Sequence, residues 1–204
     1  MSLEEIIAGV RAFQRDVFPE NRELFAELAA GQSPDALMIT CSDSRVDPDL
    51  LTQSRPGQLF VLRNAGNLVP PYDRHVGGVT ATIEFAVVGL RVPNIIVCGH
   101  SGCGAMVGLL NPATLRGMPR VGQWLEHAAV VRESLAEAGQ LDAHDALERA
   151  VAANVIVQLG HLQTHPSVAD AIAAGRVALH GWVYDVTSGE VTAYDAERQQ
   201  FVPL

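Results

Sequence analysis

The sequence predicts an α/β protein: a mostly parallel central sheet of about four strands plus a C-terminal edge strand, flanked by helices and preceded by an N-terminal helical arm. Short apolar runs alternate with helical stretches, an order typical of α/β domains. The runs are continuously apolar, as expected for parallel strands that are buried on both faces. The chain has 204 residues, 48% of them hydrophobic, and can bury one sizeable core. We therefore expect a single domain over residues 1–204, with the arm at 1–30 and the α/β core at 36–204.

The arm is predicted from apolar residues that recur at helical spacing. Pro19 and Asn21 interrupt this periodicity, so we expect two helices. Their apolar stripes have two interpretations, packing on a neighbouring molecule or covering the chain's own sheet, and the sequence alone leaves both open. The stripes consist of Ile6, Val10, Phe13, Val17 and Phe18, and of Leu24, Phe25, Leu28 and Ala29.

The expected strands are five short runs, at 36–40, 59–63, 94–98, 177–186 and 191–194. A turn at 187–190 separates the last two, which predicts an antiparallel hairpin at one edge of the sheet. Among the helices, the one at 79–90 is apolar almost all round and is expected to be buried. The other expected helices cover 105–110, 121–138, 142–163 and 167–174.

Composition argues against several classes of function. The net charge is −9 and the pI is about 5.1, so the chain lacks the basic surface that nucleic-acid binding needs. No apolar run approaches the roughly 18 residues of a membrane span, and the first residues do not resemble a signal peptide. Three cysteines, at 41, 98 and 103, do not form a secreted disulfide framework. We expect a cytoplasmic protein with neither a nucleic-acid nor a membrane partner.

A metal site is predicted where two of the apolar runs end. The run at 94–98 leads into Gly99, His100 and Cys103, and the run at 36–40 leads into Cys41. Ligands gather beyond the carboxyl ends of parallel strands, so these three side chains are expected to meet. Imidazole and thiolate are zinc ligands, and a set of three leaves a fourth position open, as in catalytic sites. His-x-x-Cys alone is weak evidence; the second cluster gives it weight.

The segment Cys41-x-Asp43-x-Arg45 carries that second cluster. If it is extended, its alternate side chains point to one side. Asp43 can then accept a hydrogen bond from a metal-bound water, while Arg45 holds the carboxylate ionised and oriented. A surface turn with a local ion pair is the simpler alternative for this segment taken alone.

Three motifs, in this order and spacing, resemble those of the β-class carbonic anhydrases. They are Cys41-Ser-Asp-Ser-Arg-Val46, Pro56-Gly-Gln-Leu-Phe-Val-Leu-Arg-Asn64 and Gly99-His-Ser-Gly-Cys-Gly104. The match runs from about Gly31 to Leu110 and extends more loosely to the C-terminal strands. The resemblance implies reversible hydration of carbon dioxide to bicarbonate and a proton by a zinc-bound hydroxide. It also implies one Zn²⁺ per chain on Cys41, His100 and Cys103, with Asp43 and Arg45 as the catalytic pair.

The resemblance further implies a homodimer at least, often paired into a tetramer, with N-terminal helices reaching across. Within the family the chain is similar to the plant-type branch, through Asn67-Leu-Val-Pro-Pro-Tyr72. Phe85 stands where that branch has a tyrosine. Met38 replaces the tryptophan of the bicarbonate-regulated bacterial branch, so we expect little such regulation and an Asp43 that pairs with Arg45 and stays off the zinc. Expected substrate-binding residues are Gln32, Val46, Phe60, Ala65 and Gly102. Arg63 and Asn64 either support the site by hydrogen bonds, the interpretation we favour, or are ordinary loop-capping residues.

Other functions remain as alternatives. The same zinc site could hydrolyse carbonyl sulfide or carbon disulfide, because access to the pocket decides the substrate. A serine hydrolase is disfavoured, because Cys103 takes the place of the last glycine in a G-x-S-x-G elbow around Ser101. A non-catalytic zinc scaffold is disfavoured by the intact Asp43 and Arg45. The remaining histidines are interpreted as surface or packing residues: His75, His127, His144, His161, His165 and His180.

Overall fold

A computed structural model describes residues 1–73 and 77–204 and divides the chain into two compact units, Met1–Ser33 and Pro34–Leu204. The boundary falls in the turn that follows the predicted arm. That both units belong to one domain stays a prediction. His75, interpreted above as a surface or packing residue, lies outside the described residues.

The first unit is helical, as predicted, and its helical run is interrupted at Asn21. Ser2 caps the first helix by accepting a hydrogen bond from the Glu5 amide, and Glu5 in turn accepts one from the Ser2 amide. None of the residues described in these helices is buried. The elements are α1 (Leu3–Ala12), the π-helical turn η1 (Phe13–Val17), α2 (Phe18–Glu20) and α3 (Arg22–Ala29).

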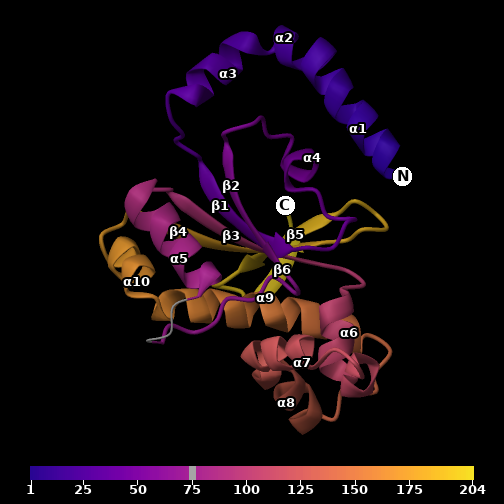
Figure 1. Cartoon of the computed structure of the whole chain (residues 1–204). Coiled ribbons are helices and arrows are strands. Elements are labelled where there is room, and N and C mark those ends of the chain that lie inside the picture. Colours follow the sequence, from indigo (N-terminus) through magenta and orange to yellow (C-terminus); the bar gives the residue numbers. More distant parts are fainter. Residues whose placement is uncertain (74–76) are drawn as a thin grey trace. The chain divides into compact units, whose positions relative to one another are not determined.

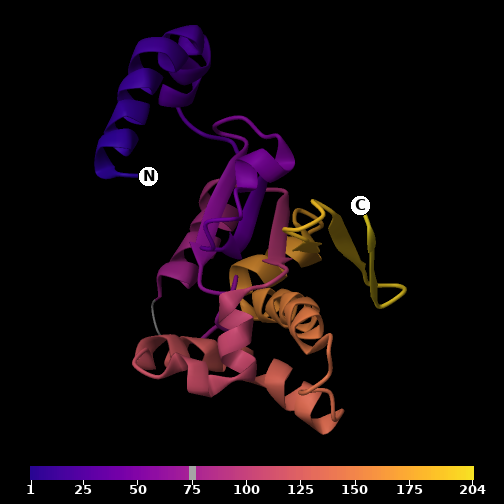
Figure 2. The same ribbon diagram turned by 90° about the vertical axis from the view of Figure 1, so that its right-hand side faces the viewer.

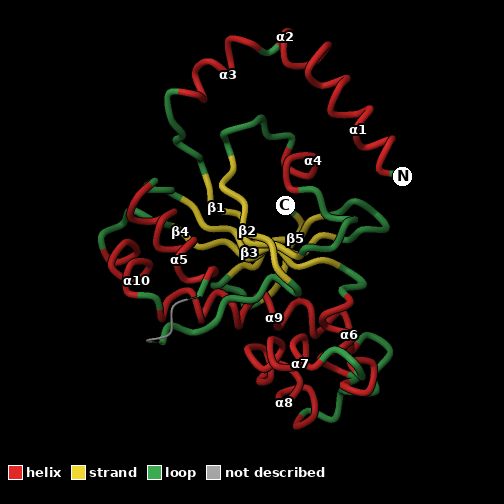
Figure 3. The backbone as a smooth tube through the Cα atoms, in the orientation of Figure 1, coloured by secondary structure: helices red, strands yellow, loops and turns green. Residues whose placement is uncertain are grey.

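The second unit is built on a six-stranded sheet with the order β2-β1-β3-β4-β5-β6 (Figures 1 and 3). The first four strands in this order are parallel, and β5 and β6 are antiparallel additions at one edge, as Figure 2 shows. The fold prediction is confirmed and extended by one strand. The strands are β1 (Ala36–Cys41), β2 (Leu59–Asn64), β3 (Asn94–His100), β4 (Ala178–Tyr184), β5 (Val191–Asp195) and β6 (Gln200–Pro203).

The strand β6 was not predicted. It has only four residues and ends at Pro203. Proline cannot donate a hydrogen bond to a neighbouring strand, so this sequence is more typical of a loop. The turn before it is closed by Asp195, whose carboxylate accepts hydrogen bonds from the amides of Glu197 and Arg198. This turn brings β6 onto β5.

The central strands are buried on both faces because alternate residues enter different clusters. Leu37 and Ile39 of β1 pack in the larger cluster with residues of α5, α9 and α10, whereas Met38 packs in a smaller one beside Leu51 of α4. The long helix α9 packs closely against β3 and β4. A Cβ on Gly99 or Gly181 would come within 2.9 Å of Val155, so glycine at these positions permits the close approach. The helices of this unit are α4 (Pro48–Thr52), α5 (Gly78–Glu84), α6 (Gly104–Leu110), α7 (Pro119–Leu125), α8 (Ala129–Glu137), α9 (Ala146–Thr164) and α10 (Pro166–Ala173).

Two of the helix predictions need correction. The stretch at 79–90 is α5 followed by the π-helical turn η2 (Phe85–Gly89), and it is not buried all round: Phe85 is 51% and Val88 61% exposed. The stretch at 121–138 is two helices, α7 and α8, separated by the short 3-10 turn η4 (Glu126–Ala128). In the described part of the chain, no helix combines the length and the apolar character that a membrane span requires.

Candidate metal centre

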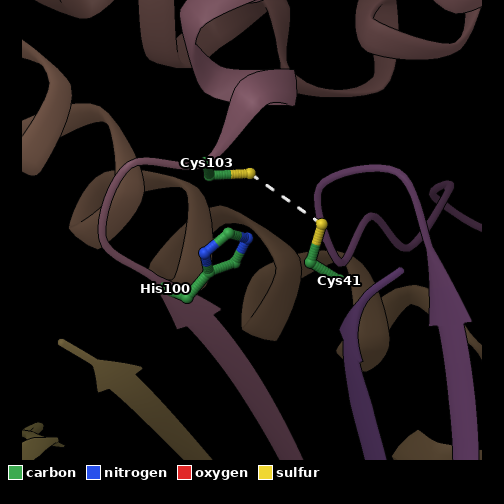
Figure 4. Close-up of side chains that lie close together, drawn as sticks. All are labelled: Cys41, His100 and Cys103. Carbon is green, nitrogen blue, oxygen red and sulfur yellow. Dashed lines mark hydrogen bonds between the residues drawn. The ribbon is translucent and has the colours of Figure 1, made fainter. Parts of the chain in front are cut away.

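Three potential ligands converge where β1 and β3 end (Figure 4). Cys41 is the last residue of β1, His100 is the last residue of β3, and Cys103 caps the N-terminus of α6. Because β1 and β3 are parallel neighbours, their carboxyl ends lie side by side. One ligand atom from each residue lies within 4.8 Å of the others, and all three residues are buried. The structure thus brings together the three residues that the sequence predicted.

The short loop between His100 and Cys103 is shaped by its glycine and its serine. Gly102 has a φ of +65°, a left-handed conformation that favours glycine. The Ser101 amide donates to Tyr184 O (2.9 Å), and the Ser101 hydroxyl accepts from the Val186 amide (2.9 Å) and donates to Asp185 (3.3 Å). The serine therefore anchors the loop to the end of β4.

The donor set fits a zinc ion. The sulfurs of Cys41 and Cys103 are 4.0 Å apart, close to the roughly 3.8 Å expected for two sulfurs each about 2.3 Å from one tetrahedral zinc. His100 Nδ1 lies 3.0 Å from the Ser101 carbonyl oxygen, which only accepts hydrogen bonds, so Nδ1 carries the proton. His100 Nε2 is buried and has no hydrogen-bond partner among the described residues. Its lone pair is thus left for a metal.

Without a cation, the two ligand thiols share one negative charge. The pKa of Cys41 is lowered to about 4, first by a hydrogen bond from the Cys103 thiol and further by the Gly66 amide, while burial opposes the shift. The pKa of Cys103 is raised, because its thiol donates to Cys41 and because it is buried. A bound divalent cation would stabilise both thiolates, so both cysteines could then be ionised.

Asp43 and Arg45 form a two-pronged ion pair beside these ligands. Arg45 Nε donates to Asp43 Oδ1 (2.9 Å) and Arg45 Nη2 donates to Oδ2 (2.7 Å), while the Arg45 amide adds a third bond to Oδ1 (3.0 Å). These bonds hold the pKa of the Asp43 carboxyl well below its usual range. Asp43 Oδ2 is also 3.8 Å from His100 Nε2, so the carboxylate borders the ligand cluster.

Arg63 and Asn64 at the end of β2 organise the surrounding loops. Arg63 donates to the backbone carbonyl oxygens of Cys41 (3.1 Å), Asp43 (2.8 Å) and Val46 (2.7 Å). The Asn64 side chain both donates to and accepts from the backbone of Leu68, at 2.8 Å each way. Both residues therefore hold backbone around the site, in line with the supporting role inferred from their position in the sequence.

One contact with a ligand was not anticipated from the sequence. The Gly66 amide donates to Cys41 Sγ at 3.4 Å. Its φ is +81°, and a Cβ there would come within 2.9 Å of the Ala105 side chain. The glycine in Asn64-Ala-Gly-Asn67, directly after a strand that ends beside the metal ligands, was the available signal.

The five expected substrate-binding residues differ in their burial and in the groups that they contact. Gln32 belongs to the first unit and is exposed. Phe60 is half-buried against Phe85, with ring centroids 5.9 Å apart, and Val46 is buried at 1% exposure. The remaining two act through their backbones: Ala65 O accepts from Trp124 Nε1 (2.9 Å) and Gly102 O accepts from Arg45 Nη2 (3.1 Å). Their roles toward a substrate stay predictions.

Comparison with known proteins agrees with this picture. A family model described as carbonic anhydrase matches residues 36–191. A carbonic anhydrase of Pseudomonas aeruginosa is 50% identical over an alignment of 208 positions, which covers 99% of this chain and 92% of that protein. The structure of the β-carbonic anhydrase CcaA is 46% identical and superposes with a TM-score of 0.95 over 99% of both chains.

A more distant structure has the same fold. A β-carbonic anhydrase of the fungus Sordaria macrospora, one of two tetrameric enzymes, is 32% identical and has a TM-score of 0.83, covering 93% of this chain and 95% of its own. The sequence relative and the structures therefore agree over nearly the whole chain, and the family model agrees over residues 36–191. The chain belongs to the β-class carbonic anhydrases, a family of enzymes.

Proposed function

We propose that the protein catalyses the reversible hydration of carbon dioxide to bicarbonate and a proton, with one Zn²⁺ per chain held by Cys41, His100 and Cys103. The observation that carries this proposal is the pairing of Asp43 with Arg45 next to a buried Cys-His-Cys cluster. A structural zinc site would use four protein ligands, whereas three leave one position for a reacting molecule.

The metal supplies one thing that the side chains cannot: when bound, Zn²⁺ lowers the pKa of a coordinated water toward about 7. The chain's own residues then orient the reaction. Asp43 stays ionised because Arg45 donates two side-chain hydrogen bonds to it, so its carboxylate can accept a hydrogen bond but has no proton to donate. Arg45 in turn is held by the Gly102 carbonyl oxygen (3.1 Å). We propose that Asp43 pairs with Arg45 during catalysis and does not bind the metal.

The substrate is small and apolar, and its product is an anion. We propose that Phe60, Val46 and Ala65 provide the apolar contacts and that the Gly102 amide and the Gln32 side chain bind product oxygens. Gln32 lies in the helical N-terminal unit. Its contribution is therefore linked to how that unit packs in the assembled enzyme.

We propose a homodimer as the smallest functional form, with a tetramer formed from two dimers. The N-terminal unit supports this, because its apolar side chains remain exposed in the single chain: Leu3 is 68%, Ile6 50% and Val10 53% accessible. Leu3, Ile6 and Val10 recur at helical spacing on α1, and apolar side chains gathered on one exposed face are typical of an interaction site. The tetrameric Sordaria enzymes agree with such an assembly.

The direct test is stopped-flow hydration of carbon dioxide by the zinc-loaded protein from about pH 6.5 to 9, a range that brackets the expected water pKa. We expect a rate that rises through one ionisation and is absent from protein stripped with a chelator. A protein that contains one zinc per chain but does not hydrate carbon dioxide would refute the proposal. Turnover of carbonyl sulfide or carbon disulfide by that same protein would identify the substrate instead.

A further inference from the structure

Two amide side chains are completely buried on the face of α9 that points to the loop after β2. Asn154 is 1% and Gln158 0% exposed. They are four residues apart and therefore lie on the same side of the helix. Burying an amide is unfavourable unless it is hydrogen-bonded, so the partners of these two side chains indicate what they do.

The two amides form a chain of hydrogen bonds that ends at a metal ligand. Gln158 Oε1 accepts from the Val69 amide (2.8 Å), and Gln158 Nε2 donates to Asn154 Oδ1 (2.9 Å). Asn154 Nδ2 then donates to Gly66 O (3.0 Å). The same Gly66 donates its own N–H to Cys41 Sγ (3.4 Å). Gly66 is therefore held on its carbonyl side by α9 while its amide meets the sulfur.

This chain has only one consistent direction. The Gly66 carbonyl oxygen can only accept a hydrogen bond, and the Val69 amide can only donate one. Asn154 must therefore present its NH₂ group to Gly66, and Gln158 must present its oxygen to Val69. The NH₂ group of Gln158 then faces the oxygen of Asn154, so each amide determines the orientation of the other.

We propose that Asn154 and Gln158 are positioning residues that keep the Gly66 N–H on the Cys41 sulfur and thereby strengthen the hold of Cys41 on the metal. A hydrogen bond to a thiolate stabilises its charge, and losing a group that orients a metal ligand typically lowers metal affinity by about 10- to 100-fold. This inference rests on the proposed zinc site. It adds residues 154 and 158 to that site, about 50 positions beyond its last ligand in the sequence.

The test compares three variants. Asn154→Leu removes the bond to Gly66 at nearly constant size. Gln158→Met keeps that bond but removes the donor that orients Asn154, together with the acceptor of the Val69 amide. Thr164→Val is the matched control: Thr164 also joins α9 to the same loop, by accepting from the Tyr72 amide (2.8 Å), but at the end away from the metal. Each variant is compared with the wild type in its rate of Zn²⁺ release to a chelator, its sulfur-to-metal absorption band after substitution with Co²⁺, and its melting temperature.

We expect Asn154→Leu to release zinc about tenfold faster, at the lower end of the effect of losing a group that orients a metal ligand. We also expect its Co²⁺ band to shift. Gln158→Met should show a smaller change of the same kind, and Thr164→Val should match the wild type in both readouts. If Asn154→Leu does not fold, Asn154→Ser, which removes the same donor without added bulk, replaces it with the same expectation.

Unchanged zinc release and an unchanged Co²⁺ band in folded position-154 variants would overturn the inference, even if the melting temperature falls. The same holds if Thr164→Val changes the release rate and the band as much as Asn154→Leu does. These outcomes are distinct from failure of the proposed function. A wild-type protein that binds zinc but does not hydrate carbon dioxide would refute the function and leave this comparison intact.

Discussion

The metal centre has two halves that are built in different ways. The ligand half, Cys41, His100 and Cys103, is at most 6% exposed and depends on the pairing of β1 with β3. The carboxylate half, Asp43 and Arg45, is more accessible, with side chains 18% and 50% exposed, and is formed within a few residues of one loop. The comparison teaches that binding a metal and directing its chemistry are separable here. Each half can be altered while the other is monitored.

The largest effect is expected from breaking the ligand half. Cys103→Ser replaces a thiolate by a poorer ligand, so zinc affinity and carbon dioxide hydration should both fall by well over the 10- to 100-fold typical of losing an outer-shell partner. Zinc content after dialysis and the stopped-flow rate measure the two losses. A variant that retains one zinc per chain and full activity would show that Cys103 is not a ligand.

Breaking the carboxylate half should separate the two properties. Asp43→Asn keeps the size of the side chain but removes the charged hydrogen-bond acceptor, so we expect hydration to slow by about 10²- to 10³-fold, the usual cost of losing one oriented hydrogen-bonding group in an active site. Zinc content should not change. Loss of zinc together with activity would mean that Asp43 supports the metal and that the two halves are not separable.

A milder substitution tests what Arg45 contributes to the action of Asp43. Arg45→Gln removes the guanidinium that lowers the pKa of Asp43, so that pKa should rise toward its ordinary value of about 3.9. A carboxyl with a pKa near 3.9 is still ionised at pH 6.5, so the pH midpoint of the rate between about pH 6.5 and 9 should stay in place. The rate itself should fall, by about 10- to 100-fold, because Asp43 loses its orientation. A midpoint displaced by a full pH unit would contradict this account.

The smallest effect is expected at the third cysteine, which belongs to neither half. Cys98 is fully buried inside β3, and burial raises the pKa of its thiol to about 12, so it stays protonated. Cys98→Val should leave zinc content and rate unchanged and lower the free energy of unfolding by about 1–3 kcal/mol at most, because it adds a methyl group to a packed strand. Denaturant unfolding with parallel zinc analysis checks this. Zinc loss in this variant would show that Cys98 also supports metal binding.

Much of this arrangement could be predicted from the sequence because it follows from local patterns. Cys41 and His100 come directly after continuous apolar runs, and parallel strands of that kind end at one edge of a sheet. The spacing of Asp43 and Arg45 similarly predicts a shared side of an extended segment, and the structure contains their ion pair.

Other features depend on tertiary contacts that periodicity does not reveal. The stretch at 79–90 was expected to be buried, yet Phe85 and Val88 of η2 are exposed, because an apolar pattern does not show which molecule covers it. Asn154 and Gln158 were not identified from the sequence, although two amides four residues apart within the otherwise apolar stretch 150–160 are a visible signal. Only the position of α9 over the loop after β2 shows what they bind.

The origin of the ligands also has a kinetic consequence. Cys41 and Cys103 are 62 residues apart in the chain, so their sulfurs meet only after β1 and β3 have paired. Contacts between residues so distant in sequence form slowly, because the intervening chain must first be ordered. Tight zinc uptake during refolding should therefore appear late and report the moment when the central sheet closes. Zinc uptake can therefore be used to follow this step of folding.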